Sequence, residues 1–474
     1  MAPGWIEAKD ARVKGGPPRD GDWWSVFQDP MLNALIGRAY QQNPNLRAVG
    51  TRVLQARSQQ GIAVGNLFPQ TQQLAGMYDA GNGFGKPFHI DTTTFNLSWE
   101  LDFWGKYRRE VESARAKSDA SVDNYDDALV TLLADVATNY VQYRVAQQRI
   151  EIARYNVSTQ ERLLGLAEQQ NKVGTATTLD AEQIRTLVEQ TRSTIPALQI
   201  ALGQANDRLC TLLGEPPRDL QMELGPWPKF GGSPMPKLPL EVAVGIPADL
   251  LLRRPDVRSA ERQVAAQSPQ IGVAKADLYP SISIGTVLGY GDLGFAPLLA
   301  SHGALAVIMP QFSWNILNYG RIVNNVHLQE NKTQEAIATY QNKVLTAAQE
   351  VQTALRGFLL SQEQTNHLAR GAAAALTATQ IEEKLFTDIK ADVNRLFTLE
   401  NTLLQVQDQL AVAQGNIALN LINVYRAIGG GWEIGHRDGS CFPTQNTTTA
   451  PEATVPPATS PSQLPQPRPA PQPR

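Results

Sequence analysis

An alternating strand, a glycine and a very long helical pattern follow one another in this chain, and the succession occurs twice. The first copy contains Trp99 and Gly105, and the second copy, 215 positions later, contains Trp314 and Gly320. Other residues matched at this offset are Tyr125 with Tyr340, Thr131 with Thr346, Asp135 with Glu350, Val136 with Val351 and Tyr143 with Phe358. Self-similarity over a unit this long indicates two halves of a duplicated domain, because solenoid repeats are much shorter.

A second repeated stretch precedes each copy. Residues 36–69 match residues 247–280 at an offset of 211. The matched residues include Pro44 with Pro255, Arg47 with Arg258, Gly61 with Gly272, Leu67 with Leu278 and Pro69 with Pro280. The change of offset from 211 to 215 places four additional residues in the strand region of the second half. We therefore expect a first half at 23–214 and a second half at 248–434.

Proline-poor helical patterns dominate both halves. The first predicts a hairpin over 106–213, whose return helix contains Pro196, where we expect a kink. The second predicts a hairpin over 321–428. At 1.5 Å per residue, each outgoing helix is on the order of 100 Å long. Such hairpins cannot bury their apolar edges alone, so they must pack against other hairpins.

Each half also predicts two strands ahead of its hairpin. They lie at 69–78 and 92–103 in the first half and at 281–290 and 305–317 in the second. In 92–103 apolar and polar residues alternate, which is typical of a strand with two different faces. One face holds Phe95, Leu97, Trp99, Leu101 and Phe103, and the other holds Asn96, Ser98, Glu100 and Asp102. A strand on a soluble core is the alternative, but the chain predicts no soluble sheet for it to join.

The predicted strands are long enough to cross a bilayer when tilted, whereas no window approaches the roughly 20 apolar residues of a spanning helix. Four strands cannot close a barrel, and an open edge is not tolerated in lipid. A dimer would provide eight strands, and a trimer twelve with room for a lumen. If these strands lie in a membrane, we therefore expect an oligomeric α+β membrane channel, internally duplicated, with four β-strands and long antiparallel helical hairpins per chain. Its trimer would form a 12-strand β-barrel and an α-helical barrel.

Three segments lie outside the two repeats. Residues 1–22 are polar and predict an extended lead-in. Residues 215–247 contain eight prolines and predict an irregular equatorial belt that connects the halves. Residues 435–474 are rich in Pro and Thr and cannot bury enough apolar area to offset chain entropy, so we expect a disordered tail.

Composition and motif content exclude several function classes. The 42 Lys and Arg against 45 Asp and Glu give a net charge of -3, which provides no basic surface for nucleic acid. Two cysteines and five scattered histidines show no metal-ligand spacing, and no catalytic constellation is visible. We therefore expect no enzyme, no metal and no cofactor. Neither a signal peptide nor an N-terminal lipid-attachment Cys is visible, so the chain is either cytosolic or, as we expect, begins downstream of its export signal.

Four motifs carry a family resemblance. They are WSVFQDP at 24–30, GIPADLLLRRPDVR at 245–258, IGVAKADLYPSI at 271–282 and VYRAIGGGW at 424–432. With them the chain resembles, over about residues 23–434, the outer-membrane channels of tripartite efflux systems. These channels form the TolC-like superfamily, and the motifs are most similar to its lipoprotein (NodT-type) branch. Pro269 departs from the family pattern and predicts a local kink.

The resemblance implies a homotrimer in the outer membrane of a Gram-negative bacterium, with a large periplasmic part. It implies a passive duct for small molecules, with a role in antibiotic resistance. The partners would be a periplasmic adaptor protein and an inner-membrane pump of the RND type, which supplies the energy. Two other functions stay open. A duct for type I protein secretion has the same architecture, and a soluble coiled-coil scaffold would require heptads with charged e and g positions.

The resemblance also implies a gate and a docking surface at the periplasmic ends of the hairpins. The second tip turn matches 386–392, where Ile389 replaces the usual glycine. Asp392, with Asp388 one turn earlier, would form an anionic ring that prefers cations; the alternative is that Asp392 only caps the return helix. The candidates for adaptor docking are Val173, Gly174, Thr175, Phe386 and Ile389. The alternative is that these residues only form the turns.

The strands imply two further sets of residues. Glu100 and Asp102 are expected to line the barrel lumen, unless they pair with Lys or Arg of a neighbouring strand. The aromatic residues expected to contact outer-membrane lipid are Phe95, Trp99, Phe103, Phe312 and Trp314.

Overall fold

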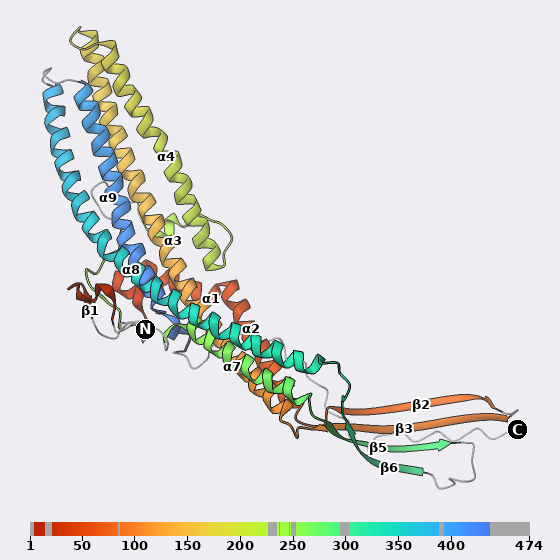
Figure 1. Ribbon diagram of the computed structural model, residues 1–474. Coiled ribbons are helices and arrows are strands. Elements are labelled where there is room, and N and C mark those ends of the chain that lie inside the picture. Colours follow the sequence, from red (N-terminus) through yellow and green to blue (C-terminus); the bar gives the residue numbers. More distant parts are fainter. Residues whose placement is uncertain are drawn as a thin grey trace, which may run out of the picture.

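The computed structural model describes residues 4–14, 21–83, 86–225, 235–236, 238–245, 247, 253–293, 303–387 and 393–436. These residues form an elongated molecule with two helical hairpins at one end and a four-stranded sheet at the other (Figure 1). The shorter helices lie between these two ends. The four strands and the long hairpins per chain confirm the predicted α+β architecture.

The hairpins are built from four long helices. In the first half α3 (Lys106–Lys172) leads into α4 (Thr178–Leu213), and in the second half α8 (Arg321–Thr387) leads into α9 (Val393–Ala427). Both outgoing helices contain 67 residues, as expected for duplicated halves. The helix bounds agree with the predicted hairpins to within a few residues, because proline-free runs and the preceding glycines mark the ends clearly.

Three shorter helices connect the hairpins to the sheet and the core. They are α1 (Pro30–Gln42), α2 (Pro44–Gly65) and α7 (Pro255–Ala276), and each starts with a proline at its first position. The N-cap of α1 is Asp29, whose Oδ1 accepts hydrogen bonds from the backbone N–H groups of Met31 and Leu32. α2 packs on α3, while α7 packs on α3 and α8.

Two prolines lie inside helices that continue through them. Pro196 is within α4 and Pro269 is within α7. A proline in a helix interior removes one backbone hydrogen bond and crowds the preceding turn. The local kink expected at each position stays a prediction.

The sheet contains four antiparallel strands in the order β2-β3-β5-β6. Their bounds are Thr71–Gly83, Lys86–Leu101, Ser281–Leu293 and Gly303–Ser313. The two halves meet between β3 and β5, where Trp99 is opposite Ile284. β2 and β6 pair on one side only, so among the described residues both outer edges of the sheet are open.

The strand ends differ from the predicted bounds. β3 ends at Leu101 instead of residue 103, because the next residue, Asp102, turns out of the ladder and caps α3. β6 ends at Ser313, so the segment 314–317 lies beyond the strand. β2 extends five residues past its predicted end at 78, across a poorly alternating sequence.

The N-terminal lead-in is more ordered than predicted. Ile6–Lys9 forms a 3-10 helix, and β1 (Val13–Lys14) pairs in parallel with β4 (Val242–Ala243) of the predicted belt. Trp5 is buried, and its indole Nε1 donates to the carbonyl oxygen of Gly245 at 3.1 Å. The lead-in and the belt, far apart in sequence, therefore hold each other in place.

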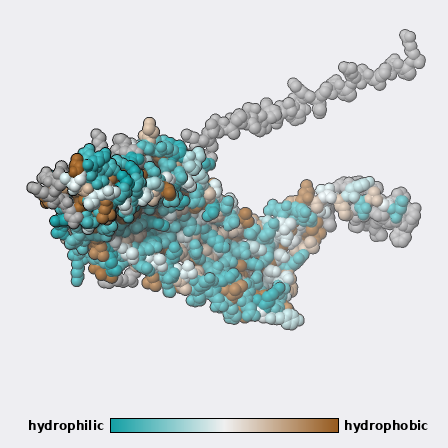
Figure 2. Space-filling view, turned by 90° about the horizontal axis from the view of Figure 1, so that it is seen from above, coloured by the Kyte–Doolittle hydropathy of each residue, from teal (hydrophilic) through white to brown (hydrophobic). Residues whose placement is uncertain are grey.

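The main hydrophobic core lies where α1, α3, α8 and α9 converge. Trp23 is at its centre, with its ring stacked on Tyr425 at 5.3 Å between centroids and its edge against Phe27. A separate small cluster joins the two hairpins near their tips and contains Leu163, Ala167, Ala181, Ile184, Phe386, Val393 and Leu396. The face of the molecule seen in Figure 2 is largely hydrophilic. Of the helices in the described ranges, none has both the length and the apolar content needed to span a membrane.

Candidate functional site

The two junctions between a strand and a long helix contain the same tryptophan hydrogen bond. The indole Nε1 of Trp99 donates to the carbonyl oxygen of Leu67 at 3.2 Å, and that of Trp314 donates to Leu278 at 3.0 Å. These pairs are related by the sequence offsets of 215 and 211. Each indole thus attaches the strand end of its half to the turn that follows α2 or α7. The duplication is therefore conserved in three-dimensional contacts as well as in sequence.

A left-handed glycine begins each long helix. Gly105 has φ +74° and Gly320 has φ +78°, a backbone region that side chains with a Cβ rarely adopt. These glycines lie directly before α3 and α8, in the turns that join strand to helix. The recurrence of one glycine per junction is therefore a requirement of the turn geometry.

Polar side chains stabilise the first junction. Asp102 accepts hydrogen bonds at 3.0 Å from the backbone N–H groups of Tyr107 and Arg108, and a third from Arg108 Nε. Burial tends to raise the pKa of Asp102, but these donors outweigh burial and the pKa is lowered. Glu100 accepts from the Tyr107 hydroxyl at 3.0 Å. In one chain both predicted lumen acids therefore bind groups at the start of α3, and their exposure to a lumen stays a prediction.

The predicted lipid-facing aromatic residues differ in exposure. Phe103, Phe312 and Trp314 are 66%, 78% and 52% exposed, whereas Phe95 and Trp99 are half-buried. Phe103 and Trp314 lie just beyond the strands that were expected to contain them. Contact with lipid stays a prediction for all five.

One aromatic residue of the junction was missed by the sequence reasoning. Trp104 stacks on Tyr279 at 4.6 Å between ring centroids, and its Nε1 donates to the carbonyl oxygen of Pro280 at 2.7 Å. It thereby links the start of α3 to the start of β5. The position of Trp104 directly before Gly105 could have indicated a role in the junction. The repeat did not strengthen this signal, because the matching residue of the second half is Tyr319 and not a tryptophan.

At the far end of the molecule, the first hairpin tip presents an exposed turn. Val173 is 74% exposed, Gly174 has φ +78°, and the Thr175 hydroxyl donates to the carbonyl oxygen of Gln170. Phe386 of the second hairpin is only 3% exposed, and its carbonyl oxygen accepts from Gln170 Nε2 at 3.1 Å. Its side chain therefore packs the two hairpins together, instead of facing outward as a docking residue would.

The remaining predicted tip residues lie outside the described part of the chain. They are Asp388, Ile389 and Asp392.

Two turns into α9, the structure brings together a group of buried polar residues that sequence reasoning did not identify. Glu400 is 2% exposed, and Gln160 of α3 is completely buried. Burial, followed by the nearby carboxyl group of Glu383, raises the pKa of Glu400 to about 7, while the Gln160 amide acts in the opposite direction. A sequence signal existed, because Glu400 falls in line with the buried positions Val393 and Leu396 of α9.

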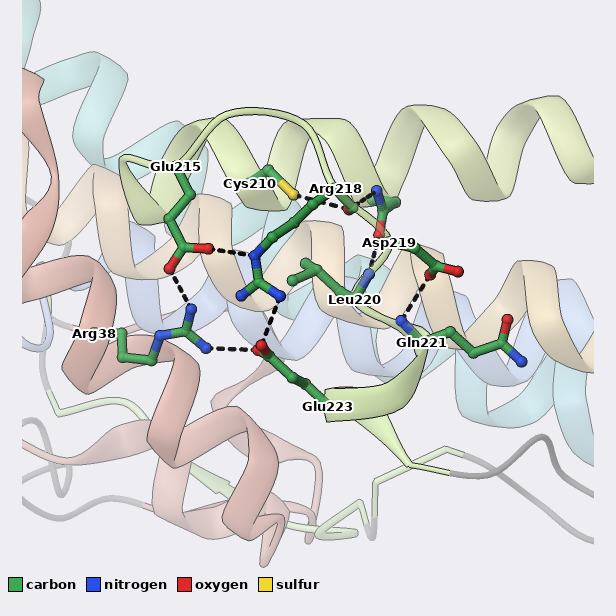
Figure 3. A network of polar contacts seen from close by, with 9 residues as sticks. Arg38, Cys210, Glu215, Arg218, Asp219, Leu220, Gln221 and Glu223 are labelled. Carbon is green, nitrogen blue, oxygen red and sulfur yellow. Dashed lines mark hydrogen bonds and ion pairs between the residues drawn. The ribbon is translucent and has the colours of Figure 1, made fainter.

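A network of ion pairs connects α1 to the segment after α4 (Figure 3). Arg38 of α1 pairs with Glu215 and with Glu223, the latter at 2.8 Å. Arg218 pairs with the same two carboxylates at 2.7 and 2.6 Å. Hydrogen bonds from Arg218 and then Arg38 lower the pKa of Glu223 to about 2. The four charges thus order the start of the predicted belt, although each exposed pair adds little stability alone.

Comparisons with known proteins agree with this geometry. A sequence model of the family described as outer membrane efflux protein matches residues 35–215 and 246–430. Among curated relatives, the pyoverdine export outer membrane protein OpmQ of Pseudomonas putida is 29% identical over 449 residues, covering 91% of this chain and 92% of that protein. Nodulation protein T of Rhizobium leguminosarum bv. viciae is 28% identical over 428 residues, covering 90% of this chain and 87% of the relative.

A solved structure of the outer-membrane channel OprN matches the fold with a TM-score of 0.82 at 28% identity, covering 91% of this chain and 97% of that structure. The sequence resemblance is thereby confirmed. The chain belongs to the outer membrane efflux protein family and is an outer-membrane efflux duct of a Gram-negative bacterium with a large periplasmic part.

Proposed function

We propose that three copies of this chain close into one channel, which acts as the passive exit duct of a tripartite pump for small molecules. The single observation that carries this proposal is the open sheet. β2 and β6 each have one unpaired edge, and unpaired backbone groups are not tolerated in lipid. Pairing β2 of one copy with β6 of the next satisfies both edges and brings twelve strands together in a trimer.

The long helices support the same assembly. α8 carries exposed apolar side chains that no other part of the described chain covers, among them Val323 (46%), Leu345 (69%) and Leu360 (54%). An apolar stripe along a helix is normally buried against a partner. A neighbouring copy would cover this stripe as the helical hairpins assemble into a tunnel. Native mass spectrometry of the detergent-extracted protein should give three times the chain mass, and a stable monomer would contradict the assembly.

The proposed partners are a periplasmic adaptor and an inner-membrane pump of the RND type, contacted through the hairpin tips. The tip turn around Val173 supports docking, because it is exposed and lies at the end of the molecule farthest from the sheet. A photo-crosslinker placed at Val173 should capture the adaptor. The same crosslinker at Met222, which is 94% exposed in the belt region, is the matched control. Capture at Met222 alone would contradict docking at the tips.

The proposed gate is the anionic ring of Asp392, with Asp388 as a second contributor. Three carboxylates close together would attract cations and resist wide opening, because like charges repel at short range. In planar bilayers, Asp392→Ala trimers should show lower cation selectivity and a higher open probability. Asp180→Ala is the matched control, since Asp180 forms the capping box at the start of α4 in the other hairpin. Equal selectivity in both variants would contradict the gate.

A further inference from the structure

The two halves of the chain meet in a contact between two aromatic side chains. Trp104 of the first half stacks on Tyr279 of the second at 4.6 Å between ring centroids, and its Nε1 donates to the carbonyl oxygen of Pro280. The sequence offsets of 215 and 211 relate Trp104 to Tyr319 and Tyr279 to Phe68. Tyr319 is 97% exposed and Phe68 is 62% exposed. One aromatic pair therefore joins the halves, while the equivalent residues lie at the surface.

The backbone of Tyr319 is also unusual. It is one of two non-glycine residues with a positive φ in the described chain, at +50°, a region that bulky side chains rarely adopt. Strained residues of this kind cluster at functional contacts, where the surrounding structure holds them in place. Because the ring of Tyr319 is almost fully exposed, packing within the described chain does not offset this strain. A contact with a partner molecule accounts for both the strain and the exposure.

The short helices show the same difference between the halves. α7 packs on α3, and a Cβ on Gly272 would lie 2.2 Å from Arg109 Cδ of α3. The equivalent glycine of α2 is Gly61, and among the described residues nothing lies within 4 Å of a Cβ placed there. Its neighbour Ile62 is 67% exposed. α2 thus leaves uncovered the face that α7 buries against a long helix, and the repeat equivalent of that long helix is α8.

The register between β3 and β5 can be transferred to the outer edges of the sheet. The strand starts relate β2 to β5 by 210 positions, and β3 is related to β6 by 215. The registers of the two hairpins, β2 with β3 and β5 with β6, agree with these offsets. Asn96 of β3 lies opposite Val287 of β5. The equivalent residues at the outer edges are Gln311 of β6 and Met77 of β2.

The two faces of the sheet provide an independent check of this register. Side chains directly opposite each other point to the same face. The observed pairs place Leu74 of β2 and Ala306 of β6 on one face, through Phe95 of β3 and Leu288 of β5. This face therefore holds even-numbered residues in both edge strands, and the two transferred residues, both odd-numbered, share the other face. A shift by one residue would place the apolar face of one edge beside the polar face of the other.

We propose that the contact between copies of this chain repeats the contact between its halves. Tyr319 stacks on Phe68 of the next copy, and β6 pairs with β2 of that copy with Gln311 opposite Met77. This inference rests on the proposed trimer and names the residues that join its subunits. The two kinds of contact differ at Pro310, which is opposite Ile284 of β5. Because proline has no N–H, its nitrogen faces away from β5, and one ladder bond is missing between copies.

Disulfide crosslinking of the intact trimer in membrane fragments tests the register. Opposite residues of an antiparallel pair have Cα atoms about 4.5–5.5 Å apart, which a disulfide can span. Gln311→Cys combined with Met77→Cys should give covalent dimers and trimers on mild oxidation. The yield should be about tenfold higher than for Gln311→Cys with Tyr78→Cys, whose side chains point to opposite faces. Asn96→Cys with Val287→Cys is the matched control within one chain, and should oxidise without a change in mass.

A double-mutant cycle tests the aromatic contact. Tyr319→Ala and Phe68→Ala should each lower the temperature at which the trimer dissociates by at least about 2 °C. The double variant should lower this temperature no further than the larger single change, because either substitution already removes the contact. Met222→Ala, at a position that is 94% exposed, is the control and should leave the temperature unchanged. Fully additive effects, or no effect of either single variant, overturn the contact.

The failure of this interface is distinguishable from the failure of the proposed duct. Trimers that crosslink Gln311→Cys best with a residue other than Met77 overturn the register and leave the duct standing. A monomer that forms no crosslink overturns both. Trimers that crosslink at Met77 but never conduct in bilayers support the interface and refute the duct.

Discussion

Replacing Tyr140 by Phe removes one hydroxyl that connects two parts of the protein. Tyr140 is completely buried on α3, its hydroxyl donates to Asp29 Oδ2 at 2.6 Å, and it accepts from Arg144 Nε at 3.1 Å. Asp29 caps α1, while Arg144 also donates to the carbonyl oxygen of Leu224 at 2.6 Å. The hydroxyl therefore fixes α1 and the segment 221–224 to the same position on α3.

The expected effect follows from these two bonds. A hydrogen bond with a charged partner contributes about 1.5–3 kcal/mol. Both partners keep other bonds in the variant, so we expect a total loss of about 3 kcal/mol in local opening free energy. At 1.36 kcal/mol per tenfold change, amides of α1 should exchange roughly 100-fold faster in Tyr140→Phe trimers.

Tyr143→Phe provides the matched control for this experiment. Tyr143 lies on the same helix and is 2% exposed. The described structure gives its hydroxyl no hydrogen bond, so the same substitution should change the exchange of α1 by less than about threefold. Indistinguishable exchange of α1 in the two variants would refute the reasoning.

Three further experiments test packing, duplication and pH dependence. Gly415→Ala places a methyl group 2.4 Å from an opposing valine of α3 and should lower the trimer's melting temperature by overpacking, whereas Gly203→Ala, with nothing within 4 Å, should not. Trp99→Phe and Trp314→Phe should each lower the local opening free energy of their junction by about 1 kcal/mol, as measured by hydrogen exchange. If the two losses of free energy differ greatly, the junctions are not equivalent. Asp102→Asn should weaken protection of the first turn of α3 at neutral pH. Because the pKa of Asp102 is lowered below 3.8, the carboxylate of the wild type stays ionised until the solution is acidic, and its greater protection of this turn should be lost only there. If the wild type and Asp102→Asn differ in protection by the same amount down to about pH 2, this role is contradicted.

Much of the architecture was predictable because its signals are local and long. Proline-free runs of more than 60 residues and the glycines before them marked α3 and α8. Alternation over 92–103 located β3, and the duplicated sequence indicated that two such units exist in one chain. Family motifs then indicated the cellular location, which periodicity alone did not.

The remaining features depend on contacts that no local pattern contains. The alternation continued through Asp102, yet helix capping took this residue out of the strand. Phe386 resembled an exposed tip residue, but the facing hairpin covers it. The buried Glu400 becomes unusual only when α3 and α8 are placed around α9. The pairing of Val13–Lys14 with Val242–Ala243 joins segments more than 200 positions apart in sequence.

The two open edges of the sheet have a genetic consequence. A subunit whose edge strand is blocked, for example by a proline introduced into β2, which contains none, can still fold its helices and enter assemblies with normal subunits. In the proposed ring every copy pairs with a neighbour on each side, so one blocked subunit prevents closure of the whole assembly. Edge alleles should therefore be dominant when co-expressed with the wild type. A substitution that prevents the core around Trp23 from folding removes the subunit before assembly, and should be recessive.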